Sequence, residues 1–353
     1  MFLLNVYLTI YSPLRGEGGR NLPFGRDWVG SIFGKAWMGY FYFMKTGLIY
    51  CPKREGFKSP EKRWKKIAEC LESHGITYDL VQSENAQSVE RLVSMLIHNG
   101  YDDIIICGGD AALCDAVNCL MREEKEVRER VVLSVIPNGL MNDFAAFWGL
   151  TEDDIKLAVE SIATRRIKKV DAGCFIYTDK EGNKRNRYFL NCINIGLVAG
   201  IQRLRTETRK IFWSRKVSYV ISLVLLLFQR MFWKMEYTIN YETEQHRVMT
   251  MCIGSALGFG QTPNAVPYNG MIDVTVMRNS AFTQIFSAIA LFLRGKILNH
   301  KMILPYRCHD ITIKVPKNTP VSIDGHSFSD IDTSTDPMKV IVEQEAINFI
   351  IEK

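Results

Sequence analysis

Two glycine turns, each following a short apolar segment, limit most strongly how this chain can fold. The segment DIIIC (residues 103–107) leads into GGD at 108–110, and VVLSVIP (131–137) leads into NG at 138–139. Continuous apolar runs of this length are typical of strands buried on both faces of a parallel sheet. Open sheets of this kind bind ligands where the carboxyl ends of neighbouring strands meet. The pattern therefore predicts an α/β fold with a ligand site at the two turns.

The alternation of strand and helix extends over the preceding residues. The segments 46–50 and 76–82 predict two further strands, and apolar residues at helical spacing predict helices over 60–75, 89–99 and 111–122. Repeated strand–helix units produce a mostly parallel sheet covered by helices on both faces. Glycines at the strand ends let the backbone approach a phosphate, and the next helix offers it free N–H groups. For GGD taken alone, a plain strand-to-helix turn is the alternative.

After about residue 167 the pattern changes to short β-rich segments bounded by turns, which predicts an antiparallel sandwich or barrel. Helical blocks at about 198–233 and 281–298 interrupt it. We therefore expect an N-terminal doubly wound α/β nucleotide-binding domain over 44–167. A C-terminal antiparallel β-sandwich-like domain is expected over 168–353, with the active site in the cleft between the two. The last segment, KVIVEQEAINFII, is expected to return to the first domain.

Residues 1–43 fit neither pattern. They contain YSPLRGEGGRNLPFGRDW, which is rich in glycine and arginine and has no clear periodicity. We expect a poorly ordered extension, or sequence upstream of a true start at Met38 or Met44. The apolar beginning lacks the basic region and cleavage site of a signal peptide. The longest apolar run, 217–228, is shorter than the ~20 residues that a membrane-spanning helix needs.

Composition excludes several classes of protein. Hydrophobic residues make up 47% of the chain and charged residues 23%, which are values of a globular protein and exclude disorder. The nine cysteines form no C-x-x-C pair, so we expect reduced, buried thiols in a cytoplasmic protein and no zinc site. The net charge of +6 is too weak to predict nucleic acid as a partner. It fits anionic ligands or an anionic membrane surface.

Five motifs occur in order along residues 45–353. They are GGDAALCDAVNCL (108–120), PNGLMNDFA (137–145), FLNCINIG (189–196) preceded by Asp171, PNAVPYNGMIDV (263–274) and DGH (324–326). Together they resemble the diacylglycerol kinase catalytic-domain family, which includes bacterial lipid kinases and sphingosine and ceramide kinases. NAD kinases share the first motif, which the family writes GGDGT. The second and fourth motifs favour the lipid-kinase branch.

The resemblance implies ATP-dependent phosphorylation of a lipid hydroxyl, on diacylglycerol, a sphingoid base or ceramide, or another amphipathic alcohol. It implies ATP and Mg²⁺ as cofactors, with the magnesium neutralising the phosphates. The residues that it places against the nucleotide are Gly108, Gly109, Asp110, Ala111, Ala112, Gly139, Asn142 and Asp143. Its catalytic positions are Asp110, Asn269 and His326, and Asp273 is a candidate metal ligand. An acidic residue in the family takes the proton of the lipid hydroxyl while the phosphoryl group transfers.

Several motif residues depart from the family pattern. The last two residues of GGDGT are Ala111 and Ala112, so a methyl group is added and a phosphate-binding hydroxyl is lost. Leu140 replaces a threonine, Asn269 replaces an aspartate and His326 replaces a glutamate. Asparagine cannot accept a proton as a carboxylate does, whereas Asp110 is retained and an imidazole can accept one near neutral pH. The alternative to an active kinase is therefore a pseudokinase that binds lipid or nucleotide without turnover.

Residues 202–216 (QRLRTETRKIFWSRK) combine six basic residues with one acidic residue and two aromatic rings. Such a segment is either a solvated helix face or a surface that contacts a membrane from the cytoplasmic side. The expected membrane contacts are Arg203, Arg205, Arg209, Lys210 and Trp213. A peripheral location at the inner membrane face would bring a lipid kinase to its substrate.

A purely structural interpretation is open for four of the motif positions. Asp324-Gly325 can be a simple hairpin turn. Asn191 and Asn194 can be structural hydrogen-bonding residues, and Asp273 can close a turn.

Overall fold

The structure is a computed structural model that describes residues 45–52, 60–84, 88–139, 142–201, 232–279, 294–333 and 336–352, with a few residues between 284 and 291. Residues 44–353 form one compact unit. The expectations for residues 1–43, for the apolar run 217–228 and for most of the two helical blocks lie outside the described residues. Among those that are described, no helix is both long and apolar enough to span a bilayer.

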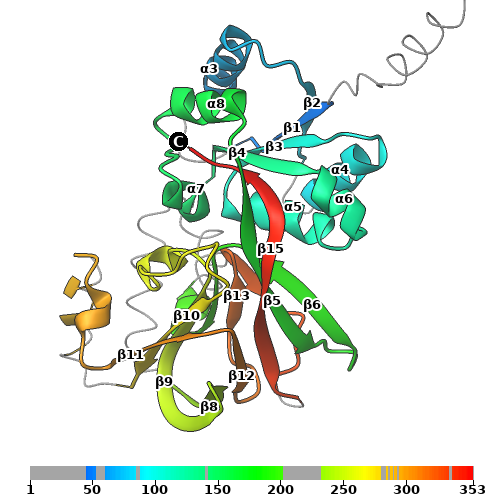
Figure 1. Ribbon diagram of the computed structural model, residues 1–353. Coiled ribbons are helices and arrows are strands. Elements are labelled where there is room, and N and C mark those ends of the chain that lie inside the picture. The colour runs from blue at the N-terminus through cyan, green and yellow to red at the C-terminus, as the bar shows by residue number, and fades with distance from the viewer. Residues whose placement is uncertain are drawn as a thin grey trace, which may run out of the picture. The chain divides into compact units, whose positions relative to one another are not determined.

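The first part of the chain is a parallel sheet with helices on both faces (Figure 1). Its strands are β1 (Thr46–Tyr50), β2 (Asp79–Gln82), β3 (Asp103–Gly108) and β4 (Val132–Pro137), in the spatial order β2-β1-β3-β4. The helices are α3 (Pro60–Ser73), α4 (Ser88–His98), α5 (Asp110–Leu120), α6 (Lys125–Arg130), α7 (Asp143–Phe147) and α8 (Ile155–Thr164). The doubly wound arrangement expected from the sequence is confirmed.

Alternation of side chains along each strand explains why both faces of this sheet are covered. Leu48 and Ile105 lie in one core with residues of α3 and α8. Their neighbours Ile49, Ile104 and Ile106 lie in a second core with residues of α4 and α5. Each strand is therefore apolar throughout, which is the sequence signal that predicted it.

The second part is a set of antiparallel strands. They are β5 (Ile167–Thr178), β6 (Lys184–Phe189), β7 (Cys192–Gly196), β8 (Trp233–Ile239), β9 (Glu242–Gly254), β10 (Ile272–Arg278), β11 (Ile303–Cys308), β12 (Asp310–Lys314), β13 (Val321–Ile323), β14 (His326–Phe328) and β15 (Met338–Ile350). Two short 3₁₀ turns, Gly258–Gly260 and Ile297–Asn299, accompany them. Phe175, Phe189 and Tyr237 are among the large side chains fully buried in this region. The expected β-rich second part is confirmed.

The last strand, β15, belongs to both parts. Its first half pairs with β12 and β5, and Asn348 and Phe349 near its end pair in parallel with β4. The C-terminal segment, which was expected to return to the first domain, thus pairs with a strand of the parallel sheet. Its register with β5 shifts between Glu343 and Ile347, where Glu345 has a φ of 50°. Because of β15, the strands of the described residues form a single 15-stranded sheet.

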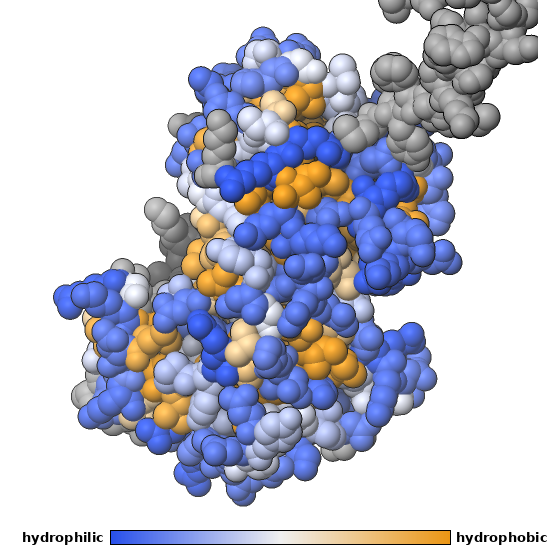
Figure 2. Space-filling view, viewed as in Figure 1, coloured by the Kyte–Doolittle hydropathy of each residue, from blue (hydrophilic) through white to orange (hydrophobic). Residues whose placement is uncertain are grey.

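The expected boundary at 167/168 falls at the start of β5, whose first residues pair with the end of β15. In the space-filling view, hydrophilic residues cover much of the visible surface and hydrophobic residues appear as separate patches (Figure 2). The large hydrophobic side chains that remain exposed include Leu80, Phe232 and Tyr268.

Candidate functional site

The two glycine turns predicted from the sequence are in direct contact. The N–H of Asn138 donates to the carbonyl of Gly108 at 2.8 Å, which continues the pairing of β3 with β4. A Cβ placed on Gly139 would lie 2.2 Å from the Cα of Gly109. No side chain fits between these backbones, so glycine at 139 is what allows the two turns to meet.

Two asparagine side chains hold the second turn in shape. Asn142 accepts from the N–H of Gly139 at 2.9 Å and donates to its carbonyl at 3.3 Å. The buried Asn138 donates to the carbonyl of Cys51 and accepts from Arg63 Nε at 2.7 Å. The turn is therefore fixed to the ends of β1 and β4 and to helix α3.

Asp110 joins the two turns through its side chain. Its carboxylate accepts from the backbone N–H groups of Asp143 at 2.8 Å and Phe144 at 3.1 Å, so it caps the N-terminus of α7. Only 4% of the residue is exposed. Burial raises the pKa of Asp110 to about 7; the N–H of Asp143 opposes this, and the charges of Asp143 and Asp324 reinforce it.

Helix α5 begins immediately after the first turn and differs from α7 in its capping. Its N-cap is Gly109, which has no side chain that could accept a hydrogen bond from the helix. The first N–H groups of a helix have no partner within the helix and carry a partial positive charge. The residues at this end, Asp110, Ala111 and Ala112, thus offer backbone donors to an anion such as a phosphate.

Asp324 is a second buried carboxylate beside the first. It accepts from the N–H groups of Leu190 at 2.8 Å, Asn191 at 3.0 Å and Cys192 at 2.7 Å. Burial raises its pKa to about 6, although these three donors oppose the shift. Ile323 and His326 are paired across Asp324-Gly325, so the hairpin interpretation is correct and the aspartate also fixes the start of β7.

Asp171 fixes the segment that contains Asn269. Its carboxylate accepts from Gly270 N–H at 2.7 Å and from Glu345 N–H at 3.0 Å, which ties this segment to β15. Asn269 itself is exposed, and its Oδ1 accepts from the N–H of Met271 at 3.0 Å. The amide therefore stabilises a local turn.

The carboxylate of Asp273 is paired with an arginine side chain. Arg307 donates to both of its carboxylate oxygens, at 2.6 and 3.1 Å. The described residues contain no group of three or more His, Cys, Asp or Glu side chains that could hold a metal ion. Asp273 is therefore not part of a cluster of metal-binding side chains in this part of the chain.

Asn191 and Asn194 make structural hydrogen bonds. Asn191 Oδ1 accepts from the N–H of Gly258, and Asn194 Oδ1 accepts from Gln261 Nε2, both at 2.9 Å. Both asparagines are buried, and they fix the segment after β9 against β7. This agrees with the structural interpretation of the two residues.

His326 lies beside a buried carboxylate, Asp115, that the sequence analysis did not single out. Its Nε2 is 3.8 Å from Oδ2 of Asp115 in the middle of α5. Asp115 Oδ1 accepts from Arg187 at 2.6 Å, and Arg187 also donates to Glu90 at 2.8 Å. Sequence reasoning missed Asp115 and Arg187 because 72 residues separate them and neither stands out in its own segment.

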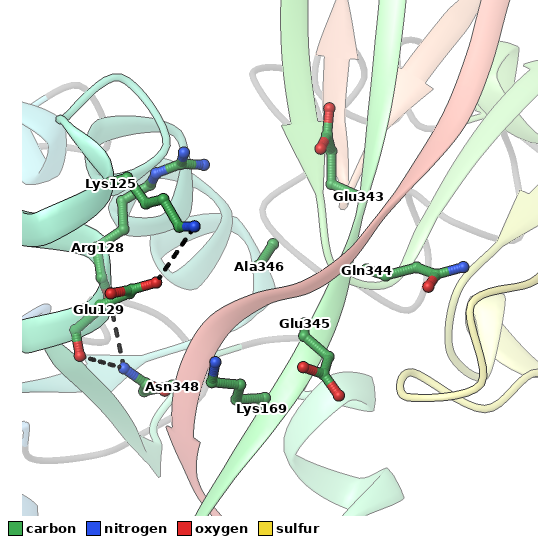
Figure 3. Close-up of a pocket in the computed structure, with 9 residues that line it drawn as sticks. All are labelled: Lys125, Arg128, Glu129, Lys169, Glu343, Gln344, Glu345, Ala346 and Asn348. Carbon is green, nitrogen blue, oxygen red and sulfur yellow. Dashed lines mark hydrogen bonds and ion pairs between the residues drawn. The ribbon is translucent and has the colours of Figure 1, made fainter.

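A pocket of about 190 Å³ lies between α6 and the irregular part of β15 (Figure 3). Three basic and three acidic side chains are among the residues that line it: Lys125, Arg128, Lys169, Glu129, Glu343 and Glu345. None of the predicted nucleotide-binding residues belongs to its lining. Leu140 and the predicted membrane contacts Arg203, Arg205, Arg209, Lys210 and Trp213 lie outside the described residues.

The fold and the site define a two-domain α/β and β-sandwich-like protein with a glycine-turn site on its parallel sheet. A family model described as the diacylglycerol kinase catalytic domain matches residues 47–175, and the YegS C-terminal NAD kinase beta sandwich-like domain matches residues 192–349. The chain belongs to the diacylglycerol kinase catalytic-domain family, as its motifs predicted.

Three known proteins are similar to this chain in sequence or in fold. A diacylglycerol kinase of Bacillus subtilis is 23% identical over 231 residues, which are 64% of this chain and 71% of the relative. The crystal structure of a diacylglycerol kinase from Bacillus anthracis has a TM-score of 0.61 at 18% identity and covers 88% of this chain and 98% of its own. Yeast NADH kinase has a TM-score of 0.52 at 11% identity, covering 88% and 84% of the two chains. Both solved structures have the same fold as this chain.

Proposed function

We propose that the protein is an ATP-dependent lipid kinase that phosphorylates the hydroxyl of diacylglycerol, a sphingoid base or ceramide, or a related amphipathic alcohol. Its family membership supports phosphoryl transfer to a lipid. The observation that carries nucleotide binding is the N-terminus of α5, which follows Gly109 and has no side-chain cap among the described residues. Such an end binds phosphate through backbone N–H groups. The alanines at 111 and 112 leave those backbone donors in place.

Magnesium would accompany the nucleotide in this proposal. Mg²⁺ commonly takes one or two carboxylates together with phosphate oxygens and water, so the absence of a three-residue cluster among the described side chains is compatible with it. Asp110 and Asp143 are the first residues of the helices that follow the two glycine turns, so their carboxylates are the candidates. The ion would supply charge neutralisation of the phosphates.

Three side chains were candidates for the proton acceptor. Asn269 has no basic group and is engaged in a turn. Asp110 is almost fully buried, and its two oxygens already accept backbone hydrogen bonds. His326 keeps about a third of its side chain exposed, so a substrate hydroxyl can reach it. We therefore favour His326.

Phosphate transfer from radiolabelled ATP to a mixed lipid extract tests the proposal. We expect a labelled lipid with the wild type and at least tenfold less with Asp110→Asn, because the amide cannot accept both N–H groups that fix α7. Asp310→Asn is the matched control, since Asp310 is exposed at the end of β12. Transfer that survives unchanged in Asp110→Asn would contradict this use of the site.

A non-catalytic binding protein is the second candidate, and the turn-forming Asn269 favours it. Its expected signature is an increase in melting temperature with ATP or ADP and magnesium, without labelled lipid. If neither nucleotide raises the melting temperature, both nucleotide-based functions are wrong.

We also propose that the lipid is reached at a membrane surface. Phe232 is 42% exposed, and the guanidinium of Arg247 lies 5.2 Å from the centre of its ring. An exposed aromatic ring beside a cation suits the interface of an anionic membrane. The fraction of protein that co-sediments with vesicles of anionic lipid, compared with vesicles of zwitterionic lipid, measures membrane binding. Equal recovery with both, or no loss of binding in Phe232→Ala, would contradict the contact.

A further inference from the structure

Four charged side chains from four elements form a continuous chain beside the candidate site. Glu90 of α4 accepts from Arg187 of β6 at 2.8 Å, and Arg187 donates to Asp115 of α5 at 2.6 Å. Oδ2 of Asp115 then lies 3.8 Å from Nε2 of His326 at the start of β14. Asp115 is 6% exposed, so its charge is balanced chiefly by this arginine.

The chain ends at the elements that build the candidate site. Asp115 is on the same helix as Asp110, and the neighbouring Cys114 lies against the Asp324 carboxylate. Asp324 and Gly325 form the turn that leads directly into His326. The imidazole is therefore held by the helix that begins at the proposed phosphate site and by the hairpin packed on it.

One nitrogen of the His326 imidazole faces a carboxylate. Nε2 is buried and has no hydrogen-bond partner within 3.5 Å in the described residues, and the Asp115 carboxylate is the acceptor that faces it. A carboxylate beside one nitrogen of a neutral imidazole favours the proton on that nitrogen. Catalytic hydrogen bonds are often long in structures without substrate and shorten when it binds. The lone pair is then left on Nδ1.

We propose that His326 and Asp115 act as a pair, in which Nδ1 of His326 takes the proton of the substrate hydroxyl and Asp115 positions the imidazole. This inference rests on the proposed lipid kinase activity. The hydroxyl oxygen bonds to the γ-phosphorus of ATP while the bond from that phosphorus to the β–γ bridging oxygen breaks, and ADP leaves with that electron pair. The hydroxyl proton passes to Nδ1, and Asp115 stabilises the resulting imidazolium.

The charged groups around Asp115 explain how its carboxylate can stabilise the imidazolium. Burial raises the pKa of Asp115, and the charges of His326 and Arg187 oppose that effect, while Glu90 reinforces it. Arg187 therefore favours the anionic form of the carboxylate, and Glu90 accepts a hydrogen bond from Arg187. Glu90 is held in turn by Arg122 at 2.9 Å. Asp115, Arg187 and Glu90 are positioning residues, and the imidazole would touch the substrate.

Steady-state kinetics of His326→Ala, Asp115→Asn and the double variant test the pair. We expect His326→Ala to lower kcat by about 10²–10⁴-fold, the usual effect of a general base, and to change the KM for ATP by less than threefold. Millimolar imidazole should restore part of this loss. Asp115→Asn should lower kcat by about 10–100-fold, with partial recovery in Asp115→Glu. The double variant should be no slower than His326→Ala.

His246→Ala is the matched control, because His246 also lies beside a carboxylate, 3.0 Å from Glu244, on the distant strand β9. Additive losses in the double variant, or no rescue by imidazole, would overturn the pair. Absence of lipid phosphorylation by the wild type overturns the proposed function and the pair together. Transfer that His326→Ala leaves intact overturns the pair alone.

A measurement without turnover checks the arrangement separately. In protein with ¹⁵N-labelled histidine, long-range proton–nitrogen correlations distinguish the two tautomers, and the His326→Ala spectrum assigns the signals of His326. We expect the proton on Nε2 in the wild type and a mixture of tautomers in Asp115→Asn. A wild-type imidazole protonated on Nδ1 has no lone pair there and would overturn the proposal.

Discussion

At the scale of single residues, three of the buried carboxylates serve mainly the backbone. Asp110, Asp171 and Asp324 accept a total of seven backbone N–H bonds. Hydrogen bonds to charged groups are worth more than neutral ones, and a buried donor without its acceptor is costly. These three aspartates therefore determine the shape of the segments around the candidate site, whatever they contribute to chemistry.

Replacement of Asp324 by asparagine tests this structural role. The amide keeps one oxygen but turns an NH₂ group toward backbone donors, so we expect a loss of about 2–4 kcal/mol in the free energy of unfolding. Urea denaturation of Asp324→Asn measures it. Asp310→Asn, at an exposed ion pair with Lys339, should change the same quantity by less than about 0.5 kcal/mol. Equal effects of the two substitutions would contradict the role.

Asp110 should make stability depend on pH in a defined direction. Burial raises its pKa to about 7 from an ordinary 3.8, so the folded protein binds this proton more tightly than the unfolded chain. The stability it contributes is fully present below about pH 4 and is lost as the pH rises through 7. The unfolding free energy of the wild type relative to Asp110→Asn should therefore fall between pH 4 and 8, by about 4 kcal/mol at most. A constant difference would show that this carboxyl titrates normally.

The sequence placed these aspartates in motifs, and only Asp110 was a predicted site residue; what the three bind was not predicted. Asp110 and Asp324 stand in recognisable motifs, whereas their donors lie 33–34 and 132–134 residues away. Such contacts depend on the packing of whole elements. The pair of Asp115 and Arg187 could not be predicted for the same reason, because the two side chains meet only after α5 and β6 are in place.

At the scale of elements, the contact between the two glycine turns is the feature most sensitive to a small change. A methyl group on Gly139 would meet the backbone of Gly109, which cannot rotate away as a side chain can. We expect Gly139→Ala to separate the turns and to weaken nucleotide binding by at least tenfold.

Isothermal calorimetry with ATP and magnesium measures this prediction. Gly182→Ala is the control, because Gly182 is in a turn with no atom within 4 Å of the added methyl and only its φ of 86° opposes the substitution. It should lower stability slightly and leave the affinity unchanged. Unchanged affinity in Gly139→Ala would show that the turns do not form the phosphate site.

Elements of the first part were predicted well where a buried strand is apolar throughout. The segments 46–50 and 131–137 correspond to β1 and β4. The second strand begins at Asp79 and not at 76, because Ile76 first closes the end of α3 by donating to the carbonyl of Leu71. Pairing between distant strands, including that of β15 with β4, has no comparable local signal.

At the scale of the whole molecule, one core of the parallel part and the core of the antiparallel part share one strand. Val340 of β15 lies in the core of the antiparallel part, and Phe349 of the same strand lies in the core of the parallel part, where its ring is 5.1 Å from that of Phe144. The strand thus runs from one core to the other, with a register shift in its pairing with β5 between Glu343 and Ile347.

Shortening a buried side chain near either end of β15 should therefore destabilise residues 44–353 as one unit. We expect Phe349→Ala to cost about 3–5 kcal/mol and Val340→Ala about 1–3 kcal/mol, since both side chains are fully buried. Each should shift a single transition when unfolding is followed by far-ultraviolet circular dichroism and by tryptophan fluorescence. Two separate transitions, with each variant moving only one, would contradict the shared strand.

The path of β15 also decides how members of this family can be recombined. The parallel part is built from residues up to the start of β5 and is completed by Ile347, Phe349 and Ile351 near the other end of the chain. A chimera made with one crossover would therefore join a parallel part from one parent to a closing strand from the other. Exchange of an intact half requires two junctions, the second of them within β15, where the register shift after Glu343 already interrupts the pairing with β5.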